Sequence, residues 1–416
     1  MRMISKVVAG VAVAATLAMS VGVAMADPIN AKNPWKHGPG KLYYPGDYNS
    51  VTPRYCDVVG SGSNTTEYLF DQYSLNYNAA LLKAHKKFSQ TTSCKKDPTP
   101  FFYSWDALQN SAETAGASIT PKPGCPSTPR PNGSTPGIQA LADNVKVTGH
   151  SSVYCLDYAR SARARKSSDP TDVTFVPLAL DNVTYATVKG SNAPTDLTTA
   201  QLEAIYSCTD TTWNEVGGTS DATIVPLLPQ SGSGILTFFL TAIGGSTFTP
   251  GPCVQEPSSL EQNQGVSSVF TGSSAVNEII PFSAGKWVAQ AYHSPACSRK
   301  TCLTDRTGVF IKCNNPKKGQ NDFGCDVNGK LVLGDINGTS PTTGSGSSTA
   351  LNPGFTTGFV QAVYAVVRGT NSIPRYLQPF FSRTAKNSFC SKTNQKTLIP
   401  DYGFEANPDC GVPGAF

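Results

Sequence analysis

Val58-Val59-Gly60-Ser61-Gly62-Ser63-Asn64 joins a short apolar strand to a turn of glycine and serine. A helix is expected after this turn, because Asn64 is a favourable N-cap with Glu67 three residues later. Apolar residues then recur at helical spacing as far as Phe88. A second strand, Ser/Gly-rich turn and helix follow one another between Ile224 and Ile243. Strands that alternate with helices predict an α/β fold with a mostly parallel sheet.

The composition fits an ordinary folded protein of two or three domain-sized units. The chain has 416 residues, 39% of them hydrophobic, which is enough to build cores. Lys+Arg 33 against Asp+Glu 28 gives a net charge of +5, without blocks of basic residues. This pattern lacks the basic patch of a nucleic-acid-binding protein, so we expect no nucleic-acid partner.

The first 26 residues have the pattern of a secretory signal peptide. Arg2 and Lys6 precede an apolar stretch that ends in Ala24-Met25-Ala26, an A-x-A cleavage pattern. An uncleaved membrane anchor is the alternative, but the stretch is rich in alanine and valine rather than leucine. No cysteine follows it to carry a lipid. We therefore expect a secreted, extracellular protein cleaved after Ala26.

All twelve cysteines lie beyond this segment. An even number of cysteines in an exported chain predicts disulfides, whose pairing the sequence leaves open. A metal site is the alternative for the cluster of Cys297, Cys302, Cys313 and Cys325, but their spacing lacks the C-x₂-C pairs of a zinc site. We expect no metal and no cofactor.

Three Ser/Gly-rich turns, at residues 60–65, 132–135 and 231–234, each precede an expected helix. Unpaired N–H groups and the positive end of the dipole make a helix N-terminus an anion site, and three such turns can converge on one ligand. A basic stretch at 159–166 follows a strand, where ligands of α/β sheets bind. Three unrelated helix caps and a solvated basic loop are the alternatives.

These motifs together resemble the phosphate-binding proteins of bacterial ABC transporters, within the type II periplasmic-binding superfamily. The resemblance covers about residues 57–290. It rests on these segments, in order: Gly60 to Thr65, Asn132 to Ile138, Tyr158 to Arg163, Leu197 to Gly218, Ser231 to Gly234 and Asn277 to Phe282. It implies two α/β lobes that close on a ligand in the cleft between them.

The resemblance also implies how the chain is divided. The expected parts are the signal peptide at 1–26, an extended arm at 27–53, the first part of lobe 1 at 54–180, lobe 2 at 181–285, and a return to lobe 1 at 286–416. The last part contains a Cys-rich insertion at about 295–350, in which the Ser/Thr/Gly-rich run from Asn337 to Gly354 is expected to be a flexible loop.

The resemblance implies phosphate, or a related oxyanion, as the ligand of a monomer that delivers it to an ABC permease. The expected ligand-binding residues are Ser63, Asn64, Thr65, Ser134, Thr135, Arg160, Ser161, Arg163, Ser233 and Gly234. The chain departs from the family at three ligand-binding positions. The family's arginine falls near Gln230, its threonine falls at Ile235, and its aspartate falls at Ala162. Arg160 and Arg163 flank Ala162 and are expected to supply the charge.

Two other functions remain open at this point. A secreted cell-surface or structural protein that kept the fold without the phosphate site is favoured by the three departures. A secreted phosphoester hydrolase would need a base or a metal, and no such constellation is found, so we expect no enzyme.

Overall fold

The computed structural model describes residues 53–84, 89–90, 92–107, 118–257, 260–265, 268–293, 297–298, 301–302 and 328–415. The predicted signal peptide, residues 27–52 of the predicted arm, Cys313 and Cys325 lie outside these residues.

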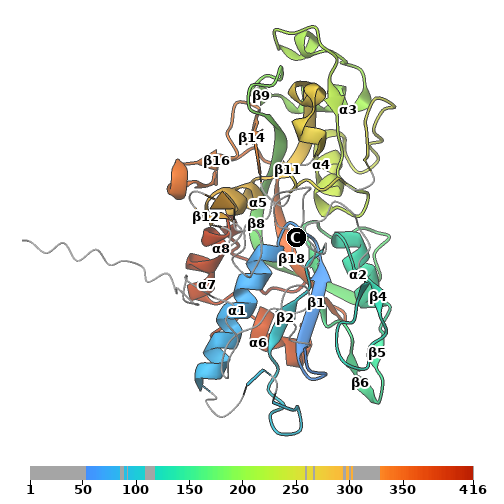
Figure 1. Ribbon diagram of the computed structural model, residues 1–416, viewed down its shortest axis with the longest axis vertical. Helices are drawn as coiled ribbons and strands as arrows, with labels where there is room; N and C mark the ends of the chain where they lie inside the picture. Colours follow the sequence, from blue (N-terminus) through green and yellow to red (C-terminus); the bar gives the residue numbers. More distant parts are fainter. Residues whose placement is uncertain are drawn as a thin grey trace, which may run out of the picture.

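A nine-stranded sheet runs along the long axis of the molecule (Figure 1). Its strand order is β10-β11-β8-β18-β7-β1-β2, and β14 and β19 also pair with β8. The strands are β1 (Val58–Gly62), β2 (Phe102–Ser104), β7 (Tyr158–Ser161), β8 (Val173–Val188), β10 (Val225–Pro226), β11 (Glu278–Ser283), β14 (Leu331–Leu333), β18 (Val360–Arg368) and β19 (Glu405–Ala406). Five two-stranded ribbons complete the strands: β3 (Ser118–Ile119) with β4 (Thr128–Pro129), β5 (Lys146–Val147) with β6 (His150–Tyr154), β9 (Asp196–Leu197) with β15 (Asp335–Ile336), β12 (Cys297–Ser298) with β13 (Thr301–Cys302), and β16 (Thr342–Thr343) with β17 (Ala350–Leu351).

The long strand β8 belongs to both halves of this sheet. Residues 173–182 pair with β18, whereas residues 183–188 pair with β11 and β14. The sequence predicts two separate stretches here, because Asp181 and Asn182 interrupt the apolar pattern. The structure keeps both residues in the strand, fully buried, since Asp181 accepts hydrogen bonds from Ser283 Oγ (2.6 Å) and Gly285 N (2.9 Å).

The prediction of a mostly parallel sheet is wrong. Strand β1 is parallel to β2 and β7, and β10 is parallel to β11. All pairings of β8 and β18 within this sheet are antiparallel. The sheet is mixed because segments late in the chain return beside β8, a long-range pairing that local sequence patterns do not encode.

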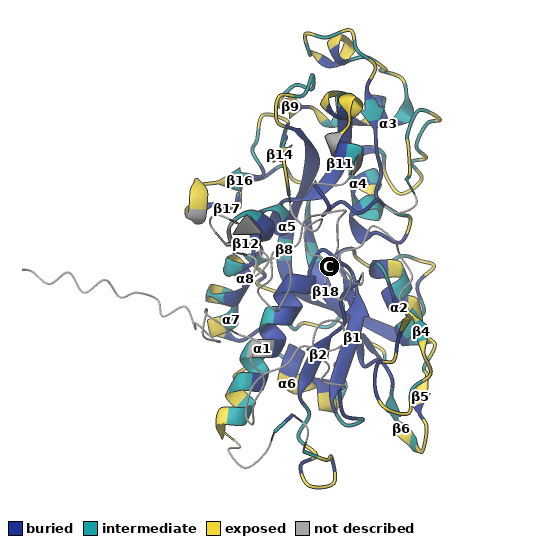
Figure 2. Ribbon diagram, in the orientation of Figure 1, coloured by how far each residue is buried: buried dark blue, intermediate teal, exposed yellow. Residues whose placement is uncertain are grey.

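Helices cover the sheet at both ends. The α-helices are α1 (Glu67–Ala84), α2 (Ser134–Ala142), α3 (Thr199–Ser207), α4 (Gly234–Gly244), α5 (Ala284–Val288), α6 (Gln378–Phe381), α7 (Lys392–Lys396) and α8 (Leu398–Asp401). Helices α1 and α2 pack beside β1, β2 and β7, while α3 and α4 lie at the other end near β11 (Figure 1). The strands between them are almost entirely buried (Figure 2).

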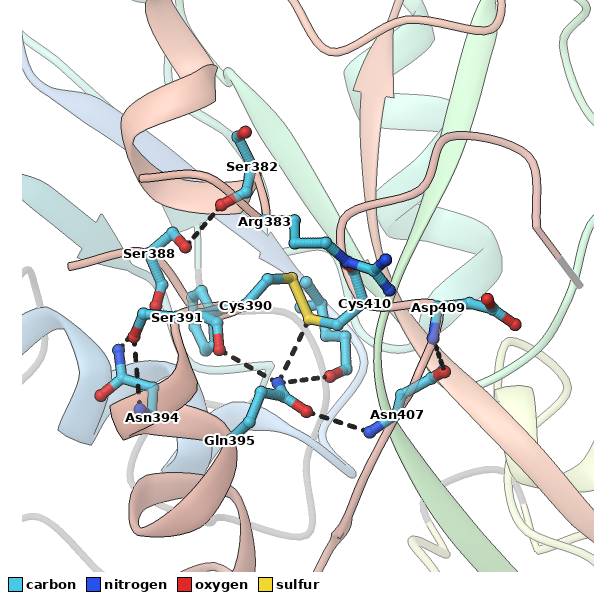
Figure 3. The surroundings of a disulfide bond; sticks show 12 residues. Ser382, Arg383, Ser388, Cys390, Ser391, Asn394, Gln395, Asn407, Asp409 and Cys410 are labelled. Carbon is cyan, nitrogen blue, oxygen red and sulfur yellow. Dashed lines mark hydrogen bonds between the residues drawn. A yellow bond between two sulfur atoms is a disulfide. The ribbon is translucent and has the colours of Figure 1, made fainter. Parts of the chain in front are cut away.

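Four disulfides are present among the described residues. They join Cys56 to Cys94, Cys125 to Cys155, Cys208 to Cys253, and Cys390 to Cys410. Figure 3 shows the last of these in the C-terminal tail, where the Gln395 side chain donates to Cys410 Sγ (3.2 Å) and accepts from Asn407 N (3.0 Å). The prediction of disulfides is confirmed for these eight cysteines.

The prediction that the run from Asn337 to Gly354 is a flexible loop is wrong. Strands β16 and β17 form a hairpin inside it. The buried Asn182 of β8 donates hydrogen bonds to the carbonyl groups of Pro341 (2.9 Å) and Asn352 (3.0 Å). This part of the run is therefore fastened to the central strand, although its composition is typical of a linker.

Candidate functional site

The structure brings the three Ser/Gly-rich turns together near the middle of the molecule. The first and second turns meet where Gly133 N donates to Gly62 O (3.4 Å). The second and third meet where Thr135 N donates to Gly232 O (3.3 Å). Backbone hydrogen bonds thus join residues that are 71 and 97 positions apart in the sequence.

Glycine is required at two of these contacts. Gly62 has φ +128, and a Cβ there would lie 2.6 Å from the Arg160 carbonyl oxygen. Gly133 has φ +102, and its Cβ would clash with the Gly232 carbonyl. Both positions combine a positive φ with close packing. A side chain at Gly62 would push the first turn away from β7, and one at Gly133 would separate the second turn from the third.

The predictions that Asn64 caps the first helix and Thr135 the second are wrong. Helix α1 begins at Glu67, and the Asn64 side-chain amide donates to Glu261 Oε2 (2.5 Å). Helix α2 begins at Ser134, one residue earlier than its expected cap Thr135, and its first turn has no side-chain cap. Ser233 does cap α4.

Arg160 is fully buried beneath the first turn. Its Nε donates to the Ser63 carbonyl (2.8 Å), and one terminal nitrogen donates to the Trp105 carbonyl (2.7 Å) and to Ser104 Oγ. The other lies 3.3 Å from the Gly62 carbonyl and 3.9 Å from a Glu67 carboxylate oxygen. The guanidinium group therefore holds the protein backbone in place.

Arg163 is paired with an internal carboxylate. Its two terminal nitrogens bind Asp169 at 2.7 and 2.8 Å, and one also donates to Thr135 Oγ1 (3.2 Å). Burial disfavours ionised Asp169, but hydrogen bonds from Arg163 and the Lys166 amide outweigh it and hold the pKa of this carboxyl below its usual value. One donor of Arg163, the buried Nε, has no partner among the described residues.

The basic loop that carries Arg163 also borders an open pocket of about 540 Å³. The opposite wall is formed by α4 and the segment after it, including Phe238 and Phe248. Lys166 belongs to the wall that the basic loop forms, and burial together with the nearby Arg163 lowers its pKa. This pocket is half-open to solvent and lies beside the turns rather than between them.

The remaining predicted residues lie where the turns touch. Ser134 Oγ accepts from Ala162 N (3.0 Å), and a Cβ on Gly234 would clash with that same oxygen. Ser161 Oγ donates to the Arg163 carbonyl (2.8 Å). Helices α2 and α4 therefore contact each other directly at their N-termini.

The first turn carries buried hydroxyl groups without partners. Thr65 and Thr66 are 2% and 0% exposed, and neither Oγ1 atom has a hydrogen-bond partner within the described part of the chain. Burying a hydroxyl in this state costs free energy. Such groups mark a place where a ligand or water would be stabilised.

Sequence reasoning missed Glu261 and Asn132. Glu261 is 1% exposed, and its two carboxylate oxygens accept from Asn64 Nδ2 (2.5 Å) and Asn132 Nδ2 (2.6 Å). Asn132 opens the second turn, so its place in that motif was a usable signal. No local pattern marks Glu261, which is 197 residues from Asn64 in the sequence.

Comparison with known proteins agrees with this architecture. Residues 103–294 match the family model described as a PBP superfamily domain. This match covers less than half of the chain. The α/β, periplasmic-binding-protein-like fold class predicted from the sequence is confirmed, and the matched stretch includes every predicted site residue except Ser63, Asn64 and Thr65.

The chain is also similar to solved structures. An ABC-type phosphate transport receptor from Vibrio cholerae matches with a TM-score of 0.46 and 15% identity, over 84% of this chain and 100% of that chain. A phosphate-binding protein from Stenotrophomonas maltophilia matches with a TM-score of 0.41 and 14% identity, over 85% of this chain and 91% of that chain. No curated protein matches by sequence.

Among the described residues, no helix is both long and apolar enough to cross a membrane. Within the same part of the chain, no group of three or more His, Cys, Asp or Glu side chains is arranged to hold a metal ion.

Proposed function

We propose that this protein is an exported solute-binding protein that captures phosphate, or a related oxyanion, where its first two Ser/Gly-rich turns meet. The ligand would be held between lobe 1 (54–180 and the return segment from 286) and lobe 2 (181–285). An ABC permease is the proposed partner of the monomer. No catalytic role is assigned to any residue.

The observation that carries this proposal is the binding of the Glu261 carboxylate by Asn64 and Asn132. A carboxylate is itself an oxyanion, and two amide donors from two separate turns converge on its two oxygens at 2.5 and 2.6 Å. The geometry of the turns is therefore suited to bind a planar or tetrahedral group whose oxygens are spaced like those of a carboxylate.

The proposed ligand set combines these amides with the residues predicted from the sequence. It consists of Asn132 together with Ser63, Asn64, Thr65, Ser134, Thr135, Ser161, Ser233 and Gly234. We assign Arg160 and Arg163 a supporting role, because each is already bonded to protein carbonyl or carboxylate groups. They fix the turns and contribute positive potential without direct contact to the ligand.

Phosphate titration of the chain from residue 27, refolded with its disulfides intact, tests the proposal. We expect Thr65→Val to weaken binding about tenfold or more, since a hydrogen bond to a charged group contributes about 1.5–3 kcal/mol. The unliganded protein should be no less stable, because Thr65 Oγ1 has no partner to lose among the described residues. Calorimetry measures affinity, and thermal unfolding measures stability.

Thr174→Val is the matched control. Thr174 lies on β8 with its hydroxyl donating to the Gly369 carbonyl (2.6 Å), and strands β18 and β7 separate β8 from β1 and the first turn. This variant should lose stability and keep the affinity for phosphate. Equal affinity of Thr65→Val and the parent protein would remove Thr65 from the ligand set.

A structural protein that has lost its ligand is the second candidate. The specific observation in its favour is that Arg160 and Arg163 are both bonded internally. Folded protein that binds neither phosphate nor sulfate, even after Glu261 is replaced, would establish this candidate instead.

A further inference from the structure

We propose that Glu261 is an internal counter-ligand: its carboxylate occupies the oxyanion position, and an external anion binds only by displacing it. This inference rests on the proposed function and adds a competitor built into the chain. It makes Glu261 the residue that sets the affinity and the charge selectivity of the cleft.

The carboxylate is enclosed rather than lying on the surface. Glu261 is 1% exposed, and its neighbours Gln262 and Asn263 are 0% and 2% exposed. Asn64 Nδ2 bonds both Glu261 Oε2 (2.5 Å) and Asn263 Oδ1 (2.9 Å). One amide of the first turn therefore binds two side chains of the same short segment.

The segment around Glu261 reaches the turns from the other end of the sheet. Gln230 N, at the start of the third turn, donates to the Leu260 carbonyl (2.9 Å). Ser283 N, at the end of β11, donates to Gln262 Oε1 (3.2 Å). Residues 260–265 are thus anchored near the third turn and β11 while Glu261 contacts the first two turns.

Polar groups that neighbour Asn64 and Glu261 in the sequence are buried without partners among the described residues. The hydroxyl groups of Thr65 and Thr66, next to Asn64 in sequence, have no partner among the described residues. The same holds for the buried Gln262 Nε2, next to Glu261. A tetrahedral oxyanion offers four oxygens, so it would engage donors that the carboxylate leaves unused.

Competition follows from charge as well as from space. An anion and the Glu261 carboxylate cannot share the Asn64 and Asn132 amides, and two like charges within a few ångströms repel strongly in a buried site. Anion binding must therefore move residues 260–265 away from the first two turns. The unliganded chain is held closed by its own side chain.

The test compares phosphate and sulfate titrations of the parent protein and Glu261→Gln. Glutamine keeps the shape but removes the charge and one acceptor, so both anions should bind about tenfold more tightly or better, the equivalent of one charge-assisted hydrogen bond. Glu203→Gln, on the exposed face of α3, makes the same change in net charge and should leave both affinities as in the parent.

The outcomes separate this inference from the proposed function. Unchanged affinity in Glu261→Gln, with phosphate still bound, would overturn the inference and leave the function standing. Weaker binding would also overturn it, because the carboxylate would then assist the ligand. Absence of binding in every folded variant would remove the proposed function and this inference with it.

Hydrogen exchange of the parent protein provides a measurement that needs no variant. Saturating phosphate should accelerate exchange of the amides in residues 260–265, including Gln264 N, which now donates to the Glu261 carbonyl (3.2 Å). Slower exchange of this segment with phosphate would contradict displacement.

Discussion

Replacing Arg160 by methionine should lower the free energy of unfolding by about 3–5 kcal/mol, the range for removing one partner of a buried charged pair. The guanidinium is fully buried and satisfies the carbonyl groups of Ser63 and Trp105, at 2.8 and 2.7 Å. It also lies 3.9 Å from the buried Glu67 carboxylate. Methionine fills much of the space but leaves these acceptors without a donor. Urea denaturation with intact disulfides measures the change.

Arg165→Met is the matched control for this variant. Arg165 lies in the loop that follows β7, the strand of Arg160, and also donates to backbone carbonyl groups, those of Pro170 (2.8 Å) and Val173, but it is only partly buried. Its replacement should cost about 1 kcal/mol, the ordinary net contribution of such bonds. Equal losses of unfolding free energy in the two variants would mean that Arg160 does not hold the backbone in place as described above.

Asp181 should make the protein lose stability as the pH rises from about 4 to 7. Burial raises the pKa of this carboxyl to about 7, against hydrogen bonds from Ser283, Gly285 and Asn182 that lower it. Between pH 4 and 7 the folded state keeps the proton that the unfolded state has lost, so the folded state is favoured below this window. The contribution, about 4 kcal/mol for a pKa raised from 3.8 to about 7, is lost progressively over this window and is absent above pH 7.

Asp181→Asn should remove this dependence, because asparagine resembles the protonated acid. We expect similar stability of the two proteins near pH 4 and a more stable variant at pH 8, measured by thermal unfolding across the range. Asp172→Asn, an exposed position immediately before the same strand, provides the comparison. Parallel pH profiles for the parent and Asp181→Asn would show that Asp181 is ionised in the folded protein throughout.

The local motifs of the fold were predictable from the sequence. Thr198 and Gln201 have the sequence spacing of a capping box and form one at the start of α3, and Ser233 caps α4. Both depend on residues within one turn of the helix start, so neighbours in the sequence decide them. Asn64 fails the same prediction: α1 begins at Glu67, and the Asn64 side-chain amide donates to Glu261, which is 197 residues away in the sequence.

The candidate site was predictable only in part. Glycine and serine around residues 62, 133 and 232 indicated that three turns would meet, and the structure brings them together. The sequence also placed Arg160 and Arg163 there, but it did not reveal that each is bonded to protein acceptors. A free arginine and a paired one have the same local sequence, and only the packed structure shows the partner.

By itself, the sequence determined the class of the chain: alternating strands and helices, Gly-rich turns before helix starts, and the motif order of a periplasmic-binding-protein-like fold. These features depend on backbone conformation and on residues a few positions apart. The tertiary structure alone decided that β8 runs unbroken through both halves of the sheet, that Asp181 is buried in it, and that Glu261 fills the space between two turns. The physical reason is that hydrogen bonds and burial between distant segments outweigh local preference, since a buried charge requires partners wherever in the chain they are found.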